Sequence, residues 1–333
     1  MTKILIVGSG AAGLLFLWLL EKSQEVHPSD VVIIDPHHDG GDLQRRWSTV
    51  KSNTIWNQTL DVFDLSGANI PTGWKDLDPT TPADLQYSIS LLRHMTRGFM
   101  SQCEVVHGFV DQIEKQVDGK LWSVTLTDKS NYTAPIVILA HGSEPKQLSL
   151  PIPSIPLDCA LSISRLESYV NKNSRVMLFG TSHSGTLIMK NLHELGVQTT
   201  AFYNTEKPFY YARDGEYDGI KQDSADIADA IVANRYPKVQ LCHVTDTAQV
   251  IKASRKADWV IYAIGFKVRT SVKINMTYDG KTGEVTGFPG VWGFGIAFPN
   301  KADDDIHWDV SIPSFFAHIK NQMPSILKYL SKG

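Results

Sequence analysis

The stretch KILIVGSGAAGLL at residues 3–15 decides the fold. It begins with a continuous apolar run, which predicts a buried strand, and it continues into AAGLLFLWLLEK, which predicts a buried helix. Between the two, Gly8, Gly10 and Gly13 form the pattern G-x-G-x-x-G. A second buried strand follows at VVIID, residues 31–35. Strands of this kind, joined by a helix, predict a parallel sheet that is covered on both faces.

Each glycine of this turn has a physical role in holding a dinucleotide. Gly8 allows the tight turn, Gly10 lets the backbone approach a pyrophosphate, and Gly13 lets the helix pack closely on the strand. The helix that begins at Ala11 and Ala12 supplies amide donors and a positive dipole to the phosphates.

An acid closes the second strand of this unit. Asp35 stands where such an acid accepts a hydrogen bond from a ribose hydroxyl. The context of strand, turn, helix, strand and acid therefore predicts a dinucleotide site, although the motif alone does not separate FAD from NAD.

The same pattern recurs later in the chain. SRVMLFG at 174–180, a helical segment at 186–196 and VQTTAFYN at 197–204 repeat the opening unit. The proline-rich LPIPSIPL at 150–157 indicates a crossing between domains. We therefore expect one dinucleotide domain over 1–149 and 266–333, and a second over 150–265.

Residues 105–140 have a different pattern, with short alternating segments separated by turns, which predicts an antiparallel β-meander that returns to the parallel sheet.

The final segment, PSFFAHIKNQMPSILKYL, has helical apolar spacing and is expected to pack on the first domain. The predicted fold class is thus α/β, with two Rossmann-like domains whose parallel sheets carry helices on both faces, and a β-meander in the FAD domain.

The second turn reads GTSHSG, with Ser182 in the place of the middle glycine. The serine hydroxyls could donate to phosphate oxygens. A hydrolase with Ser182 as nucleophile is disfavoured, because the nucleophile elbow G-x-S-x-G needs glycine at 184. The residues expected to contact the second nucleotide at this turn are Gly180, Ser182, His183, Ser184 and Gly185.

NADPH is favoured as the nicotinamide cofactor, and NADH stays open. VQTTAFYN has no acid at the position that would select NAD through its 2'-hydroxyl. Lys207 and Arg213, in the segment that follows, could meet a 2'-phosphate, although a solvated surface would explain them equally well.

The order of these motifs resembles the flavoproteins with two dinucleotide domains, the group of glutathione reductase and the flavin-containing monooxygenases. In that group a strand ending in an Ala-Thr-Gly-like turn follows a meander; here the turn reads Ala140, His141, Gly142, and a second version ends at Gly265. The C-terminal GVWGFGIAFPN resembles the strand that closes the flavin site, with Ile296 after Gly295 in place of an Asp. The resemblance implies FAD at the first turn and contacts to it from these segments.

The segment DGGDLQRRWSTVKSNT at 39–54 resembles class B flavoprotein monooxygenases, in which a Gly-Gly element, a Trp and an Asn-Thr pair follow the acid. The resemblance implies that Asn53 lies at the flavin edge as the catalytic residue, where an amide could steady a flavin peroxide or the nicotinamide carboxamide; an ordinary polar loop is the alternative. The family's F-x-G-x-x-x-H signature is missing before the second turn. Further expected FAD contacts are Pro36, Arg46, Trp47 and Val110.

Composition excludes several classes of function. The formal net charge is -3, from 32 basic and 35 acidic residues, without a basic block, so nucleic acid is not expected as a partner. The three cysteines are far apart and form neither a C-x-x-C pair nor a metal-ligand spacing, so we expect no metal. The apolar run at 4–20 is interpreted as the strand, turn and helix of the nucleotide unit rather than a signal peptide or membrane span, which predicts a cytoplasmic protein without a membrane partner.

These observations predict an FAD-dependent oxidoreductase that is reduced by NADPH and acts on a small molecule. The leading hypothesis is a monooxygenase that inserts oxygen at a soft nitrogen or sulfur nucleophile. The alternatives are an NAD(P)H-dependent flavin reductase or dehydrogenase without oxygen insertion, and an FAD-binding module without turnover. The sequence leaves the substrate and a homo-oligomeric state open.

Overall fold

The computed structural model describes residues 2–117, 119–209, 212–213, 216–217, 220, 223–269, 272, 277–301 and 308–331, with the backbone alone at 212–213, 216–217 and 309. Its contacts divide the chain into two units. The first comprises residues 1–48, 55–144 and 267–333, and the second comprises 49–54 and 145–266. The sequence predicted residues 49–54 in the first domain, whereas the structure groups them with the second unit.

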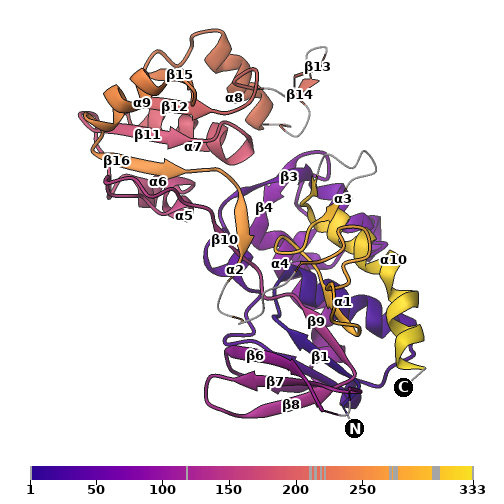
Figure 1. The fold of residues 1–333 in the computed structure, drawn as a ribbon. Helices are drawn as coiled ribbons and strands as arrows, with labels where there is room; N and C mark the ends of the chain where they lie inside the picture. The colour runs from indigo at the N-terminus through magenta and orange to yellow at the C-terminus, as the bar shows by residue number, and fades with distance from the viewer. Residues whose placement is uncertain are drawn as a thin grey trace. The chain divides into compact units, whose positions relative to one another are not determined.

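The first unit is built on a parallel sheet of five strands (Figure 1). Their order is β18-β9-β1-β2-β5, so that β1 lies in the centre and pairs with β2 and β9. Every side chain of β1 is buried, as expected for a strand covered on both faces. The bounds are β1 Ile4–Val7, β2 Val31–Ile34, β5 Glu104–Val106, β9 Ile136–Leu139 and β18 Val291–Gly293.

The two faces of this sheet are covered by different structures. Ile4 and Ile6 of β1 belong to a hydrophobic cluster with α1 (Ala11–Ser23), α4 (Leu85–Met100) and α10 (Ile312–Leu330). Leu5 and Val7 belong to a second cluster with the antiparallel meander β6-β7-β8. The meander thus covers the face opposite the helices, and α10 packs against α1 as the sequence predicted. The meander strands are β6 Val110–Lys115, β7 Trp122–Leu126 and β8 Asn131–Ala134.

Short elements complete the first unit and the segments between the units. The helical turns are η1 Pro28–Asp30, α2 Asp42–Arg45, α3 Trp56–Asp61, η2 Gly67–Asn69 and η3 Thr72–Trp74. The short strands are β3 Lys51–Ile55, β4 Pro82–Asp84, β10 Ser143–Pro145, β17 Phe266–Val268, β19 Asn300–Lys301 and β20 Trp308–Asp309.

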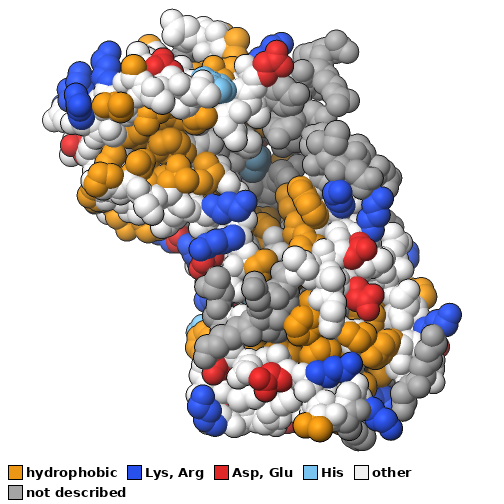
Figure 2. Space-filling view, viewed as in Figure 1, with side chains coloured by type: hydrophobic (Ala, Val, Ile, Leu, Met, Phe, Trp, Pro, Cys, Tyr) orange, Lys and Arg blue, Asp and Glu red, His pale blue; other side chains and the backbone are white. Residues whose placement is uncertain are grey.

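The second unit repeats the architecture of strand, helix and strand. Its parallel sheet has the order β15-β12-β11-β16, and α7 packs against α8. Figure 2 shows hydrophobic side chains gathered on one face of this unit. Helix α9 contains no buried residue among those described. The main elements are β11 Arg175–Phe179, α7 His183–Glu194, β12 Gln198–Tyr203, α8 Asp223–Val232, β15 Val239–His243, α9 Thr247–Ser254 and β16 Trp259–Tyr262. The remaining ones are α5 Leu157–Ala160, α6 Ile163–Leu166, β13 Ala212–Arg213 and β14 Glu216–Tyr217.

The structure confirms the predicted fold class of two α/β units with parallel sheets and a β-meander in the first. In that unit the meander, rather than helices, covers the second face of the sheet. None of the described helices is long and apolar enough to cross a membrane.

Candidate functional site

The first glycine turn connects β1 to α1 and requires glycine at two of its positions. Gly8 has φ +102°, and a Cβ there would lie 2.3 Å from the carbonyl oxygen of Ala140. A Cβ on Gly13 would lie 2.0 Å from the carbonyl oxygen of Gly8. Both glycines are therefore required by conformation and packing, as the sequence predicted.

Gly10 is different, because nothing inside the protein requires a glycine there. Its φ of -75° and ψ of -169° suit any residue, and a Cβ at this position would find its nearest neighbour in the carbonyl oxygen of Gly40, at 3.9 Å. The space over Gly10 is thus open to a ligand. Gly10 caps α1 without a side-chain hydrogen bond, and the amides of Ala11 and Ala12 in the first turn have no partner within the helix. This cradle fits a pyrophosphate.

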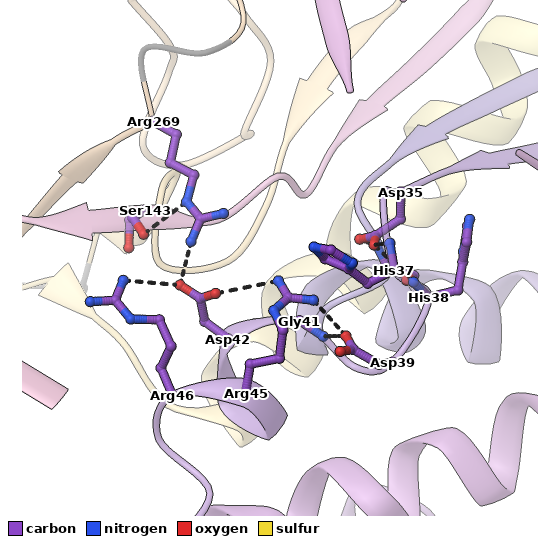
Figure 3. A network of polar contacts seen from close by, with 11 residues as sticks. Asp35, His37, His38, Asp39, Gly41, Asp42, Arg45, Arg46, Ser143 and Arg269 are labelled. Atoms are coloured by element: carbon purple, nitrogen blue, oxygen red, sulfur yellow. Dashed lines mark hydrogen bonds and ion pairs between the residues drawn. The ribbon is translucent and has the colours of Figure 1, made fainter. Parts of the chain in front are cut away.

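Asp35 is buried beside this turn and is held by backbone donors (Figure 3). Its Oδ2 accepts the N–H of Ser9 at 2.8 Å, and its Oδ1 accepts those of His37 and His38 at 2.8 and 3.0 Å. Burial raises the pKa of Asp35, but the three N–H donors outweigh burial, so that the pKa lies below its ordinary value. A carboxylate has about four acceptor positions, so the ionised Asp35 can still accept one ribose hydroxyl.

A cluster of charged residues follows Asp35 and lies against the turn. A Cβ on Gly41 would be 3.1 Å from the Cα of Gly10, so the loop approaches the turn closely. Asp42, which begins α2, pairs with Arg45 at 3.4 Å, with Arg46 at 3.6 Å and with Arg269 (Figure 3).

The cluster brings three arginine side chains together. Asp39 accepts the N–H of Gly41 at 3.0 Å and pairs with Arg45 at 2.6 Å, and Arg269 also donates to the carbonyl of Ser143. The guanidinium groups of Arg45, Arg46 and Arg269 thus lie around Asp39 and Asp42, beside the glycine turn. The sequence did not single out Arg269, because its partner Asp42 is far away along the chain.

The turn after β9 forms the other side of this site. The N–H of Ala140 donates to the carbonyl of Val7 at 2.8 Å, and Gly142 has φ +75°. Both ring nitrogens of His141 are buried without a hydrogen-bond partner in the described residues. Burial and the charge of Arg269 lower the pKa of His141 to about 4, so its ring is neutral at pH 7.

The structure also brings the C-terminal turn to the first helix. Gly295 has φ +87°, and a Cβ there would lie 2.8 Å from the Cβ of Ala12. Ile296 packs partly buried against the core of the first unit. The C-terminal turn thus lies directly against the first turn of α1.

The remaining residues predicted to contact FAD differ in how deeply they are buried. Pro36 lies half-buried directly after Asp35. Trp47 is buried, and the guanidinium carbon of Arg46 lies 5.0 Å from its ring centre. The side chain of Val110 is buried in the cluster between the sheet and the meander, and its predicted contact to FAD stays a prediction.

The second glycine turn has the same geometry as the first. Gly180 has φ +99°, and a Cβ there would lie 2.2 Å from the carbonyl oxygen of Ala263. A Cβ on Gly185 would lie 2.2 Å from the carbonyl oxygen of Gly180. Gly265, predicted as a contact, has φ +86° in the turn after β16, as Gly142 has after β9.

The polar residues of the second turn divide into two groups. Ser182 caps α7 without a side-chain hydrogen bond, and Ser184 lies half-buried in the first turn of that helix. The Nδ1 of His183 lies 2.6 Å from the hydroxyl of Ser224, and the ring also bonds to the backbone of Lys51. The His183 ring therefore joins α7 to α8 and β3. Burial lowers its pKa despite these contacts.

Two of the predicted contacts for the second nucleotide follow β12. Lys207 is exposed in the segment after Tyr203. The backbone of Arg213 lies in β13, but its side chain lies outside the described residues. Asn53 is half-buried in β3, and its predicted place at a flavin edge stays a prediction.

The cysteines do not form a redox site. Cys103, Cys159 and Cys242 are all free. Burial, together with the charge of Glu21, raises the pKa of Cys103 to about 12, and burial also raises that of Cys242. The described residues contain no group of His, Cys, Asp and Glu that could hold a metal ion.

Comparisons with known proteins agree with this architecture. No family model matches the sequence. The monooxygenase AgnR1 of Paecilomyces divaricatus is 25% identical, with 96% of each chain covered. A flavin-containing monooxygenase from Stenotrophomonas maltophilia has a TM-score of 0.67 at 16% identity over 99% of both chains. The bacillithiol disulfide reductase from Staphylococcus aureus has a TM-score of 0.66 at 15% identity over 98% of both chains.

Proposed function

We propose, on the premise that the chain has the two-domain fold of the FAD- and NAD(P)H-dependent flavoproteins, that it is an FAD-dependent oxidoreductase reduced by NADPH. One observation carries this proposal: the same glycine turn is built twice, with Gly8 and Gly180 at φ +102° and +99°. Two dinucleotide cradles in one chain suit a reaction in which one bound cofactor reduces another.

The first cradle is assigned to FAD. Open space over Gly10, the amides in the first turn of α1 and the remaining acceptor position of Asp35 all fit an adenine dinucleotide. The cofactors supply the hydride transfer when bound. The residues of the chain bind and orient them, which is the main contribution of a protein to such a reaction.

The proposed reaction is monooxygenation of a small nucleophilic nitrogen or sulfur compound. The likeness to a monooxygenase along nearly the whole chain supports this choice. So do the free cysteines, because no dithiol is available to carry electrons to a disulfide. In the balanced reaction, one substrate molecule, one NADPH, one proton and one O₂ give the oxygenated substrate, NADP⁺ and water.

The test begins with the purified full chain. We expect it to take up FAD, to lose its yellow colour on addition of NADPH under argon, and to regain it in air. With a panel of small tertiary amines and thioethers, isotope-labelled O₂ should place one labelled oxygen in the product for each NADPH consumed.

The alternatives give different results. Steady NADPH oxidation with ferricyanide but little O₂ consumption would favour a flavin reductase or dehydrogenase. A colourless protein that takes up no FAD would contradict the enzyme proposal and favour a binding module.

A further inference from the structure

His183 is the first residue of α7, directly after the second glycine turn, and its ring makes two hydrogen bonds. Its Nδ1 lies 2.6 Å from the hydroxyl of Ser224, which is fully buried in α8. The ring also bonds to the backbone of Lys51 in β3. The matching residue of the first unit is Ala11, whose methyl group makes no such bond. These two bonds are therefore a feature of the second turn that the glycine pattern does not explain.

The two bonds assign the tautomer of the His183 ring. The bond to Lys51 acts to raise the pKa of His183, so the ring donates and the backbone carbonyl accepts. Burial outweighs this bond and the charge of Asp223, so that the pKa lies below its ordinary value and the ring is neutral at pH 7. A neutral imidazole has one donor and one acceptor nitrogen. Nδ1 therefore accepts the hydroxyl proton of Ser224 while the other nitrogen holds the carbonyl of Lys51.

The segment that His183 holds has ordered structure of its own. Residues 49–54 belong to the second unit, although the residues before and after them belong to the first. Inside the segment, the hydroxyl of Ser52 accepts the N–H of Thr54 at 3.1 Å and lies 2.9 Å from the hydroxyl of that residue. These contacts fix the backbone around the half-buried Asn53. The ring of His183 thus attaches an ordered segment to the start of α7.

Asn53 lies close to the point of attachment along the chain. It follows Lys51 by two residues in β3, which corresponds to roughly 7 Å along a strand. Residues two apart in a strand also point their side chains to the same face. A shift of the Lys51 carbonyl is therefore passed on to Asn53 within one ordered stretch of backbone.

We propose that His183 is a positioning residue for Asn53, and that through the carbonyl of Lys51 it holds segment 49–54 at the helix end that receives the second nucleotide. One side chain then sets both the nucleotide turn and the amide of Asn53. The ring acts through the backbone of β3 and does not touch the reacting groups. This inference rests on the proposed function, because it names a residue that orders the site of that reaction.

The first experiment measures hydrogen–deuterium exchange of the purified full chain with FAD added, by mass spectrometry of the peptide over residues 49–55. H183F keeps the bulk of the ring and removes both hydrogen bonds. It should speed exchange in this peptide by about fivefold, as expected for the loss of one hydrogen bond of ordinary strength. H183Q keeps a donor and an acceptor and should restore most of the protection. Unchanged exchange in β11 shows that a variant is folded.

The matched control for this experiment is H193F. His193 is a half-buried histidine near the other end of the same helix, with its ring 4.2 Å from that of Tyr236. Phenylalanine keeps this ring contact, so exchange of the 49–55 peptide in H193F should equal that of the unaltered protein.

The second experiment compares the oxygenated product formed per NADPH consumed in N53A, H183F and the double variant. H183F should lower this yield several-fold. If His183 acts through Asn53, the double variant should have the same yield as N53A alone, because two changes in one chain of contacts do not add. The yield is a ratio, so weaker binding of NADPH by H183F does not change it.

The outcomes separate this inference from the proposed function. Equal exchange of the 49–55 peptide in H183F and H193F would overturn the inference, and so would a double variant whose yield falls by the product of the two separate factors. If the unaltered protein then still oxygenates its substrate with NADPH, the proposed function stands. If the unaltered protein forms no oxygenated product, the proposed reaction fails, and the exchange of the 49–55 peptide alone decides the inference.

Discussion

Gly10 and Ser182 occupy the same place in two copies of one turn. Their backbone angles are -75°, -169° and -74°, -164°, and each caps the helix that follows without a side-chain hydrogen bond. The two cradles therefore differ at this position only by the side chain of the serine. At the first cradle an added Cβ would find no described atom closer than 3.9 Å, whereas the Cβ and hydroxyl of Ser182 lie where a pyrophosphate would approach.

This relationship predicts opposite effects of two substitutions at Ser182. S182G should bind NADPH as tightly as the unaltered protein or several-fold more tightly, because the approach to the backbone is opened. S182V should weaken NADPH by about tenfold, since it keeps the bulk and removes the hydroxyl that can donate to phosphate. Quenching of flavin or tryptophan fluorescence on titration with NADPH measures the affinity of each variant. Weaker binding by S182G than by S182V would contradict this assignment.

Gly10 offers a variant that separates folding from flavin binding. A valine at Gly10 meets no protein atom closer than 3.9 Å at its Cβ and adopts the existing φ without strain. G10V should therefore fold with nearly unchanged stability, yet lose FAD affinity by about tenfold or more, because the side chain fills the phosphate approach.

The control for this prediction is G73V, since a Cβ at Gly73 also has nothing within 4 Å but lies far along the chain from the turn. Absorbance of the FAD retained after gel filtration and the midpoint of urea unfolding are the two measurements. Equal FAD retention by G10V and G73V would show that the first turn does not hold the flavin.

The sequence predicted local structure well and long-range contacts poorly. Spacing of glycines after an apolar run is sufficient to predict the turns at Gly8 and Gly180, because the close approaches there involve neighbouring strands of one sheet. It was not sufficient to pair Arg269 with Asp42, or Thr181 with the carbonyl of Pro208, since these contacts depend on how loops fold back. The grouping of 49–54 with the second unit was missed for the same reason.

The pKa of His141 predicts a pH-dependent stability. Its folded value of about 4 lies below the ordinary 6.5, so the unfolded chain binds a proton first as the pH falls. Stability is therefore present above about pH 6.5 and is lost toward pH 4, at up to about 1.4 kcal/mol for each pH unit. Urea unfolding between pH 4.5 and 7.5 measures this loss.

A substitution at His141 tests whether this residue causes the loss of stability at low pH. H141L removes two buried nitrogens that have no hydrogen-bond partner among the described residues. It should therefore reduce the dependence of the free energy of unfolding on pH, without a large loss of stability at pH 7.5. H94Q, at an exposed histidine, should leave the profile unchanged. His183 and His318, whose pKa values are also lowered by burial, account for the remaining slope. An unaltered profile in H141L would mean that His141 is solvated in solution.

Asn53 tests whether the chain inserts oxygen or only passes electrons. The side chain is half-buried in β3, a strand grouped with the second unit whose Lys51 backbone bonds to His183. If its amide hydrogen-bonds the reacting groups, N53A should oxidise NADPH at a similar rate but give about tenfold less oxygenated product per NADPH, with hydrogen peroxide making up the difference. N53Q, which keeps an amide on a longer side chain, should recover part of the product. The matched control is N57A, because Asn57 is exposed and its side-chain amide donates to the carboxylate of Asp61 at 3.1 Å. Full coupling of NADPH to product in N53A would remove Asn53 from the reaction, whereas loss of NADPH oxidation itself would assign it to nucleotide binding instead.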